Sequence, residues 1–163
     1  MPIYNSFHQH QRGGSVQPFP AGLQLAGPVL PVQIEVPVAL ANQLQSANQT
    51  IPNPVSGFAL IDTGASVSAV DITVIQQLGV QQVGIANVGT AGGPQKQATY
   101  PARFAFPGTN IPTIDFSQLL GANLAGQNVP GQQGPLIALL GRDILQHFVL
   151  VYNGPLGTFT IAF

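Results

Sequence analysis

The sequence predicts an all-β fold. Short segments of alternating or continuous apolar residues recur along the chain, and clusters of turn-forming residues separate them. The composition agrees, because 19 of the 163 residues are Gly and 15 are Pro. Helical spacing of apolar residues is confined to brief stretches. At this length the chain is expected to form one domain with a real core, and not two large lobes.

Charge is scarce in this chain. Charged residues make up 6% of it and the net charge is -1, whereas about a quarter of the residues are charged in a typical globular protein. Attraction to nucleic acid or to an acidic membrane surface is therefore not expected. The lack of cysteine excludes disulfide frameworks, zinc-thiolate sites and thiol nucleophiles. Without a signal-peptide pattern or an apolar run of membrane length, a soluble, cytoplasmic protein is expected.

The first segment, residues 1–22, is rich in Gln, His, Gly and Pro and shows no sustained hydrophobic period. These features predict a flexible N-terminal arm that precedes a folded domain over residues 23–163. His8 and His10 lie in the arm, but two histidines without further ligands are more typical of solvated side chains than of a metal site. No metal or other cofactor is expected.

The first elements of the domain are a strand and a helix. Residues 29–36 alternate in their second half, which predicts a strand that Pro31 keeps near a sheet edge. One face of this strand carries three apolar residues, Val32, Ile34 and Val36. Leucines at helical spacing predict a helix over residues 38–47, with Pro37 at its first position.

A second helix is predicted over residues 72–78, with Asp71 as its N-cap and Gly79 as its stop. A long hairpin follows, because extended segments flank the turn cluster of residues 88–94. Alternate positions of its returning strand are apolar or aromatic: Tyr100, Ala102, Phe104 and Phe106. A further short helix is predicted around residues 116–120.

The C-terminal part contains a second buried strand and a final hairpin. Residues 136–140 form a continuous apolar run that Gly141 ends. Asp143 is placed as the N-cap of a helix over residues 144–147. Two extended segments around an Asn-Gly-Pro-Leu-Gly turn then predict a hairpin over residues 148–163.

The candidate catalytic residue is Asp62. It directly follows residues 58–61, a short apolar run that indicates a buried strand, where a carboxyl group is costly unless it has a use. Thr63 supplies a hydroxyl for local hydrogen bonds, and Gly64 lets another backbone pass close by. The tripeptide on its own is also typical of an ordinary turn, so its surroundings decide between the two interpretations.

Three features together resemble the retropepsin family of aspartic proteases over about residues 27–163. They are the segment Ala-Leu-Ile-Asp-Thr-Gly-Ala-Ser at residues 59–66, the Gly-rich hairpin, and Ala-Leu-Leu-Gly-Arg-Asp-Ile-Leu at residues 138–145. The resemblance implies a closed β-barrel subunit with one or two short helices that acts as a homodimer. It also implies that the strand before Gly141 and Arg142 threads behind the Asp-Thr-Gly turn.

The same resemblance implies an aspartic endopeptidase that acts on peptide or protein substrates. Asp62 would meet Asp62 of a second subunit on a two-fold axis, where the two carboxyls share one proton and activate a water. Thr63 would link the two turns, Gly64 would offer backbone groups to the substrate, and Ala65 would complete the turn. The hairpin would be a flap with three glycines: Gly89, Gly92 and Gly93. The terminal strands of both subunits would interleave into one sheet, so that the last strand keeps no unpaired edge.

Two departures from the family pattern are visible. Retroviral members often carry an acidic residue where this chain has Ser66, so Arg142 needs another partner. As an alternative, Arg142 is an ordinary surface charge at a helix start. A long Gly- and Gln-rich loop precedes Leu136 and is expected to alter the edge of the cleft or the dimer contacts. The scarcity of charge predicts a cleft that favours hydrophobic side chains.

Three other functions fit parts of the sequence. A non-catalytic, dimeric peptide-binding module of the same fold would have no use for Asp62. A nucleotide-binding protein of the actin-like type would place the glycines around phosphate, but the chain lacks a G-x-x-x-x-G-K-S/T loop and an alternation of strands and helices. A serine hydrolase using Ser66 or Ser68 would need a G-x-S-x-G turn, which the sequence lacks, and His147 lies in an apolar segment.

Overall fold

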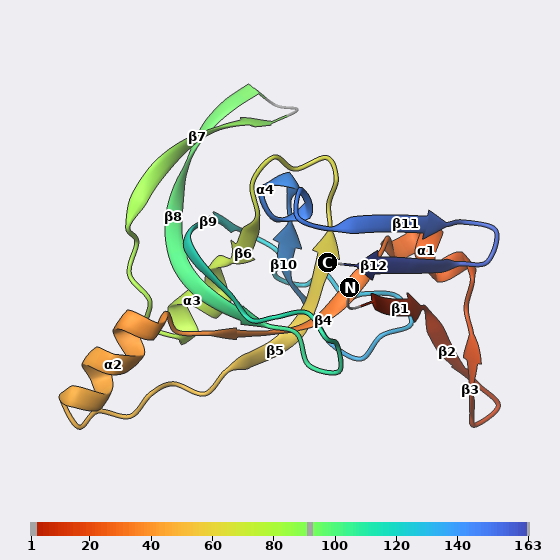
Figure 1. The fold of residues 1–163 in the computed structure, drawn as a ribbon, viewed down its shortest axis with the longest axis horizontal. Coiled ribbons are helices and arrows are strands. Elements are labelled where there is room, and N and C mark those ends of the chain that lie inside the picture. The colour runs from red at the N-terminus through yellow and green to blue at the C-terminus, as the bar shows by residue number, and fades with distance from the viewer. Residues whose placement is uncertain (1–2, 91–92, 163) are drawn as a thin grey trace.

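The computed structural model of the chain describes residues 3–90 and 93–162 (Figure 1). These residues form twelve strands and four short helices. The strands are β1 (Ile3–Phe7), β2 (Gln9–Arg12), β3 (Ser15–Pro18), β4 (Val29–Glu35), β5 (Val55–Ile61), β6 (Ala69–Asp71), β7 (Gly84–Thr90), β8 (Gly93–Ala105), β9 (Ile114–Ala122), β10 (Leu136–Leu140), β11 (Val149–Asn153) and β12 (Thr158–Ala162). The helices are α1 (Ala21–Ala26), α2 (Val38–Ser46), α3 (Ile72–Gln77) and α4 (Arg142–Leu145). None of the helices in the described ranges has the length and apolarity needed to cross a lipid bilayer.

Six strands close into a barrel. Their order is β4-β5-β10-β6-β9-β8, and β8 pairs back with β4, while β7 continues the sheet beyond β8. The main core gathers fully buried side chains from these strands: Leu30, Val32, Ile34, Val70, Phe104 and Leu119. Burial of each such side chain contributes roughly 1.5–3 kcal/mol. The predicted all-β class and closed barrel are confirmed.

β10 runs between β5 and β6, and this arrangement positions the Asp-Thr-Gly turn. β10 is parallel to β5 and antiparallel to β6, so residues 62–68 cross the end of β10 to link its two neighbours. Gly141 lies at that crossing, where an added Cβ would be 2.7 Å from the carbonyl carbon of Val67. Only glycine permits so close an approach. The predicted threading of the second apolar strand behind the turn is confirmed.

The helices α2 and α3 lie where the sequence predicts them. Pro37 is the N-cap of α2 and not its first helical residue. Asp71 caps α3 by accepting a hydrogen bond from the backbone N–H of Thr73 at 2.7 Å, and Gly79 follows with a φ of 67°. With α1 and α4, the described residues contain four helices, more than the one or two that the family resemblance implies.

The prediction of a helix around residues 116–120 is wrong, because these residues belong to β9. β9 pairs antiparallel with β8 and parallel with β6. Leu119 and Leu120 are both buried although successive residues of a strand point to opposite sides. A strand that is buried on both sides loses the alternation of apolar and polar residues, so its sequence pattern does not distinguish it from a helix.

β4 is an edge strand only in its first half, and Pro31 lies in that half, as the sequence predicts. β5 pairs with it from Val29 to Ile34, and β8 joins from Gln33 onward. Pro31 is tolerated because it precedes the stretch that β8 joins, so its missing N–H leaves no gap in that ladder. The face of β4 is as predicted, with three buried residues: Val32, Ile34 and Val36.

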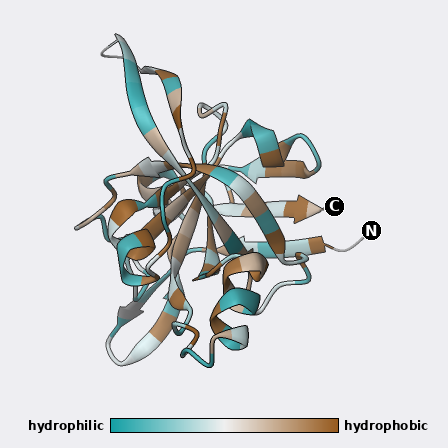
Figure 2. Ribbon diagram, turned by 90° about the vertical axis from the view of Figure 1, so that its left-hand side faces the viewer, coloured by the Kyte–Doolittle hydropathy of each residue, from teal (hydrophilic) through white to brown (hydrophobic). Residues whose placement is uncertain are grey.

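β7 and β8 form the predicted long hairpin, paired from Gly84↔Thr99 to Thr90↔Gly93. The hairpin rises away from the barrel in two views that differ by 90° (Figures 1 and 2). Gly93 has a φ of 103°, a conformation that other residues rarely adopt. Gly92, the third glycine predicted for the flap, lies outside the described residues.

Residues 3–18, most of the predicted N-terminal arm, contain regular structure. β1 pairs antiparallel with β12, and β2 pairs with β3. The first and last strands of the chain, β1 and β12, therefore lie side by side (Figure 1). His8 is only 1% exposed, and its Nε2 donates a hydrogen bond to the carbonyl oxygen of Gly27 at 2.8 Å. Pairing with the distant C-terminal strand orders a segment whose composition alone predicts flexibility.

β12 is the central strand of a three-stranded sheet in the order β1-β12-β11. Its register joins Ile3 to Ala162 on one side and Val149 to Ala162 on the other. Both edges of β12 are thus paired within one chain. The expectation that the last strand has an unpaired edge for a strand of a second subunit is wrong, because β1 and β11 occupy both positions.

Candidate active site

Asp62 follows β5 in a turn that the backbone itself holds. Its N–H donates to the carbonyl oxygen of Leu140 at 2.9 Å, which ties the start of the turn to β10. Its Oδ1 accepts hydrogen bonds from the N–H groups of Gly64 at 2.9 Å and Ala65 at 3.2 Å. The side chain is partly buried. These contacts fix the direction of the carboxylate, and its Oδ2 accepts no hydrogen bond from another described residue.

Thr63 and Gly64 lie at the exposed tip of the turn. The Thr63 hydroxyl makes no hydrogen bond to another residue in the described part of the chain. A Cβ added to Gly64 would lie 3.1 Å from Oδ1 of Asp62, closer than most Cβ contacts. The glycine therefore lets the backbone approach the carboxylate.

Arg142 binds the backbone carbonyl groups of the Asp-Thr-Gly turn. Its Nη1 donates to the carbonyl oxygens of Thr63 at 2.8 Å and Gly64 at 3.1 Å. Its backbone N–H donates to the carbonyl oxygen of Ala65 at 2.9 Å. One residue thus satisfies three successive carbonyl groups of the turn. With Ser66 in place of an acidic residue, the guanidinium group binds the backbone, and Arg142 is more than a surface charge at a helix start.

Ser68 and Asp143 form a buried link beneath the turn. The Ser68 hydroxyl donates to Oδ1 of Asp143 at 2.7 Å, and its N–H donates to Oδ2 at 2.9 Å. The same hydroxyl accepts a hydrogen bond from the N–H of Gly141 at 3.0 Å. Ser68 is 0% exposed. A hydroxyl engaged in this way and closed off from solvent does not serve as the nucleophile of a serine hydrolase.

The predicted role of Asp143 as an N-cap needs correction. α4 begins at Arg142 and its N-cap is Gly141, which has no side chain to cap it. Asp143 instead lies in the first turn, where its Oδ1 accepts a hydrogen bond from the N–H of Ile144 at 2.9 Å. The carboxylate of Asp143 reaches across to Ser68, because β10 brings the start of α4 against the loop between β5 and β6. The sequence indicates Ser68 only as a possible nucleophile of a serine hydrolase. No residue near Ser68 in the sequence signals its contact with Asp143, which lies 75 residues away.

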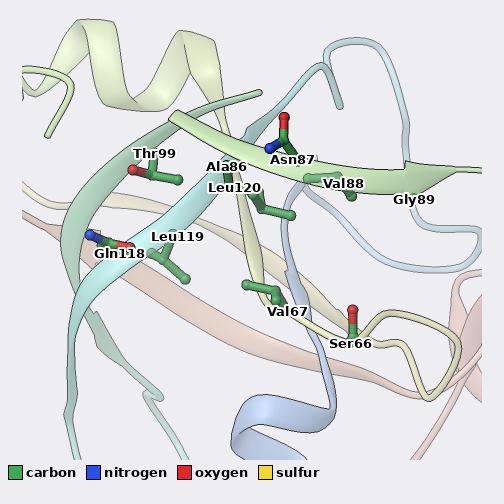
Figure 3. Close-up of a pocket in the computed structure, with 10 residues that line it drawn as sticks. All are labelled: Ser66, Val67, Ala86, Asn87, Val88, Gly89, Thr99, Gln118, Leu119 and Leu120. Atoms are coloured by element: carbon green, nitrogen blue, oxygen red, sulfur yellow. The ribbon is translucent and has the colours of Figure 1, made fainter. Parts of the chain in front are cut away.

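A cavity of about 220 Å³ lies between the loop after the turn and the β7–β8 hairpin (Figure 3). Its apolar walls come from three elements: Val67 of the loop, Ala86 and Val88 of β7, and Leu119 and Leu120 of β9. Ser66 and Gly89 also line it. Asp62 lies four residues before Ser66 on the same loop and does not itself line the cavity. The remaining lining residues, Asn87, Thr99 and Gln118, are polar, so the cavity combines apolar walls with uncharged hydrogen-bonding groups.

Asp71 is a buried carboxylate that the sequence marks only as a helix cap. It is 2% exposed, and besides Thr73 it accepts a hydrogen bond from the N–H of Leu124 at 2.7 Å. The Thr73 hydroxyl also donates to it. Asp71 therefore anchors the chain beyond β9 to the start of α3. Its hydrogen bonds within the fold indicate a structural role.

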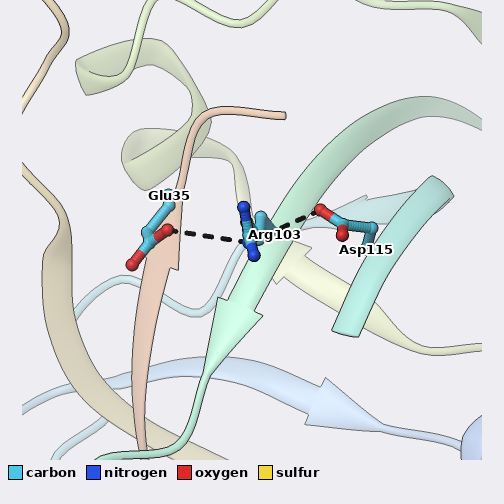
Figure 4. Close-up of polar contacts among 3 residues, drawn as sticks. All are labelled: Glu35, Arg103 and Asp115. Carbon is cyan, nitrogen blue, oxygen red and sulfur yellow. Dashed lines mark ion pairs between the residues drawn. The ribbon is translucent and has the colours of Figure 1, made fainter. Parts of the chain in front are cut away.

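Three of the nine charged residues meet at one place on the barrel surface, away from the turn. Arg103 on β8 lies 3.9 Å from Glu35 on β4 and 3.7 Å from Asp115 on β9 (Figure 4). The strand register places these residues side by side. All three side chains are at least a third exposed, so each pair contributes about 0–1 kcal/mol. The cluster supports the barrel closure and adds no group to the candidate site.

The fold of the chain, and not its sequence, shows a likeness to known proteins. No protein-family model matches the sequence, and no curated protein matches it. The fold is similar to the crystal structure of a retropepsin-like aspartic protease from Rickettsia conorii, with a TM-score of 0.41 and 16% sequence identity. The match covers 98% of this chain and 90% of that chain.

Proposed function

We propose that the chain is an aspartic endopeptidase that works as a homodimer. The observation that carries the proposal is the position of Asp62. Its carboxylate is held by two backbone N–H groups on an exposed turn, and Arg142 and Ser68 fix that turn from behind. An Asx turn uses only Oδ1 in this way, and Oδ2 of Asp62, which accepts no hydrogen bond from another described residue, is left for a water molecule or for a second copy.

The chemistry requires two carboxyl groups, and one chain supplies one. Two Asp62 carboxyls facing each other across a two-fold axis do not both ionise readily, so they hold one proton between them. The ionised carboxylate takes a proton from a water molecule, and the oxygen of that water attacks the scissile carbonyl carbon. The protonated carboxyl meanwhile donates a hydrogen bond to the carbonyl oxygen. The C–N bond of the tetrahedral intermediate then breaks, and the amine leaves with a proton from the pair.

The exposed tip of the turn suits contact with a second copy. Thr63 is exposed, and its hydroxyl can donate to the backbone of the opposing turn. Arg142 leaves this face clear, because it binds the carbonyl groups of Thr63 and Gly64 from the side of α4. The two-fold axis is proposed to pass between the two turns, so that both Asp62 side chains face one water.

The substrate is proposed to be an extended peptide with hydrophobic side chains next to the scissile bond. The walls of the cavity beneath β7 are mainly apolar, and the lining residues carry no charge. The β7–β8 hairpin is proposed to close over the peptide as a flap, with Gly89 as the lining residue that allows close backbone approach.

A peptide-library digest compares the wild type with Asp62→Asn and tests the proposal directly. The amide keeps the shape of the carboxyl group but does not exchange the proton, so cleavage is expected to vanish while the circular dichroism spectrum stays unchanged. Cleavage by pure Asp62→Asn above a trace level would remove Asp62 from the mechanism. Peptide binding by the wild type without any cleavage would favour the non-catalytic peptide-binding module.

A further inference from the structure

The cavity beneath β7 has an apolar middle and a polar end. Thr99 and Gln118 lie at one end, and Ser66, which follows the Asp-Thr-Gly turn, lies toward the other (Figure 3). Val67 and Leu120 lie between the two ends (Figure 3). A side chain that enters the cavity from the turn therefore passes apolar groups before it reaches polar ones.

Thr99 carries a buried hydroxyl without a partner. The residue is 3% exposed, and its Oγ1 makes no hydrogen bond to another residue in the described part of the chain. The large majority of buried polar side-chain atoms in proteins have such a partner. A hydroxyl that is buried without one costs stability. Beside a cavity, it indicates a ligand that supplies the missing hydrogen bond.

Gly84 leaves space beside this hydroxyl. It pairs with Thr99 across the β7–β8 ladder. A Cβ at residue 84 would lie 3.0 Å from Oγ1 of Thr99 and 4.0 Å from Nε2 of Gln118, and these are the only atoms reported within 4 Å of it. The two polar groups thus border the same space. Oγ1 is closed off from solvent in this structure, and the proposed movement of the hairpin gives a ligand access to it.

We propose that Thr99 is a specificity-determining residue, which selects peptides whose side chain in this cavity is long, uncharged and tipped with an amide. The inference rests on the proposed function, because it treats the cavity as part of a peptide-binding cleft. The stem of the side chain packs against Val67 and Leu120. Its amide both donates and accepts hydrogen bonds at the polar end, as the hydroxyl of Thr99 and the amide of Gln118 also can. Glutamine has this form.

The chemistry of the cavity rejects two side chains of nearly the same length as glutamine. None of the lining residues is charged, so the carboxylate of a glutamate would be buried without a partner. The apolar tip of a methionine would leave the Thr99 hydroxyl unpaired. A site built to form a hydrogen bond discriminates against an analogue that cannot form it.

Selection by Thr99 adds to the preference for hydrophobic side chains next to the scissile bond. Asp62 does not line the cavity and lies four residues before Ser66. The side chain that reaches Thr99 therefore belongs to a residue further along the peptide than the two that flank the bond.

The test is a digest of a peptide library in which each position in turn holds Gln, Glu or Met. With the wild type, kcat/KM at one position is expected to be about 10-fold higher for Gln than for Met, and Glu is expected to be cleaved least. Thr99→Val keeps the β-branched shape but lacks the hydroxyl, so the ratio of Gln to Met should fall to about 1. Thr113→Val is the matched control, because Thr113 is exposed and does not line the cavity. It should keep the wild-type ratio.

Thermal unfolding examines the hydroxyl without any peptide. Thr99→Val is expected to be at least as stable as the wild type, because it removes a buried hydroxyl that has no partner. A clearly lower melting temperature for Thr99→Val than for the wild type would mean that the hydroxyl is bonded within the fold, for example through a bound water, and would overturn the inference.

The outcomes separate the inference from the proposed function. Cleavage with the same ratio of Gln to Met in the wild type and Thr99→Val would overturn the inference and leave the endopeptidase standing. If the wild type cleaves no peptide of the library, the endopeptidase fails, and fluorescence anisotropy of the same peptides decides the inference. Tighter binding of Gln than of Met peptides by the wild type, lost in Thr99→Val, would support it. Equal affinities or no binding would overturn it.

Discussion

Arg142 donates a hydrogen bond to the carbonyl oxygen of Thr63 at 2.8 Å, across 79 residues of sequence. This contact joins the start of α4 to the turn that carries Asp62. It makes Arg142 a positioning residue in the proposed mechanism, because it acts on the backbone of the turn and does not contact the reacting atoms.

Arg142→Ala is expected to lower kcat more than it raises KM. Loss of the guanidinium leaves two carbonyl groups of the turn without their donor, and a small displacement of Asp62 lowers the rate on the order of 10- to 100-fold. Steady-state kinetics on a cleaved library peptide measures the split between kcat and KM. Arg103→Ala is the control, because Arg103 lies in a solvent-exposed ion-pair cluster. Equal rates for both variants would show that Arg142 does not position the turn.

Ser68→Ala is expected to destabilise the fold by about 1–3 kcal/mol, because it leaves the buried N–H of Gly141 without its acceptor and removes one donor to Asp143. Urea unfolding followed by circular dichroism measures the change. The control is Ser56→Ala, which removes an exposed hydroxyl and should change the free energy of unfolding by less than about 0.5 kcal/mol. Identical midpoints for the two variants would contradict a structural role for the Ser68 link.

Gly89→Val is expected to raise KM and leave the stability nearly unchanged. A Cβ at residue 89 meets no atom within 4 Å, and valine is favoured in strands. The added side chain would reduce the space of the cavity that Gly89 lines, so peptides should bind more weakly. Gly154→Val in the last hairpin is the matched control, because a Cβ there makes only an ordinary contact at 3.7 Å. An unchanged KM for Gly89→Val would place the peptide elsewhere.

The pH dependence of kcat/KM is expected to be bell-shaped, because only the pair of carboxyls that holds a single proton is competent. Activity should fall at low pH, where both carboxyls are protonated, and at high pH, where both are ionised. Initial rates across the pH range, with circular dichroism at each pH, separate this effect from unfolding. Activity that increases steadily to alkaline pH would be incompatible with a shared proton.

The sequence predicts best the elements whose signals are local. Asp71 and Gly79 mark the ends of α3, and the apolar run before Gly141 marks β10, because capping and burial act within a few residues. Residues 116–120 are predicted wrongly, since pairing with both β8 and β6 determines their conformation and leaves no alternation to detect. β1 is missed for a related reason, because the distant β12 provides its hydrogen-bond partners.

The residues of the candidate site show the same difference between local signals and contacts that are distant in sequence. Asp62, Thr63 and Gly64 are predicted from the sequence, because a carboxyl group directly after an apolar run is costly unless it has a use. The partners of Arg142 and Ser68 are not found, because both contacts span more than seventy residues and depend on β10 lying between β5 and β6. Such contacts follow from topology, which composition and spacing along the chain do not specify.

The most direct test of the central claim is a mixing experiment in which Asp62→Asn replaces wild type at constant total protein. If each active site needs Asp62 from two copies and subunits exchange freely, activity will fall with the square of the wild-type fraction, because mixed dimers are inactive. A linear fall would mean that each chain cleaves peptides on its own, and it would contradict the shared pair of Asp62 carboxyls.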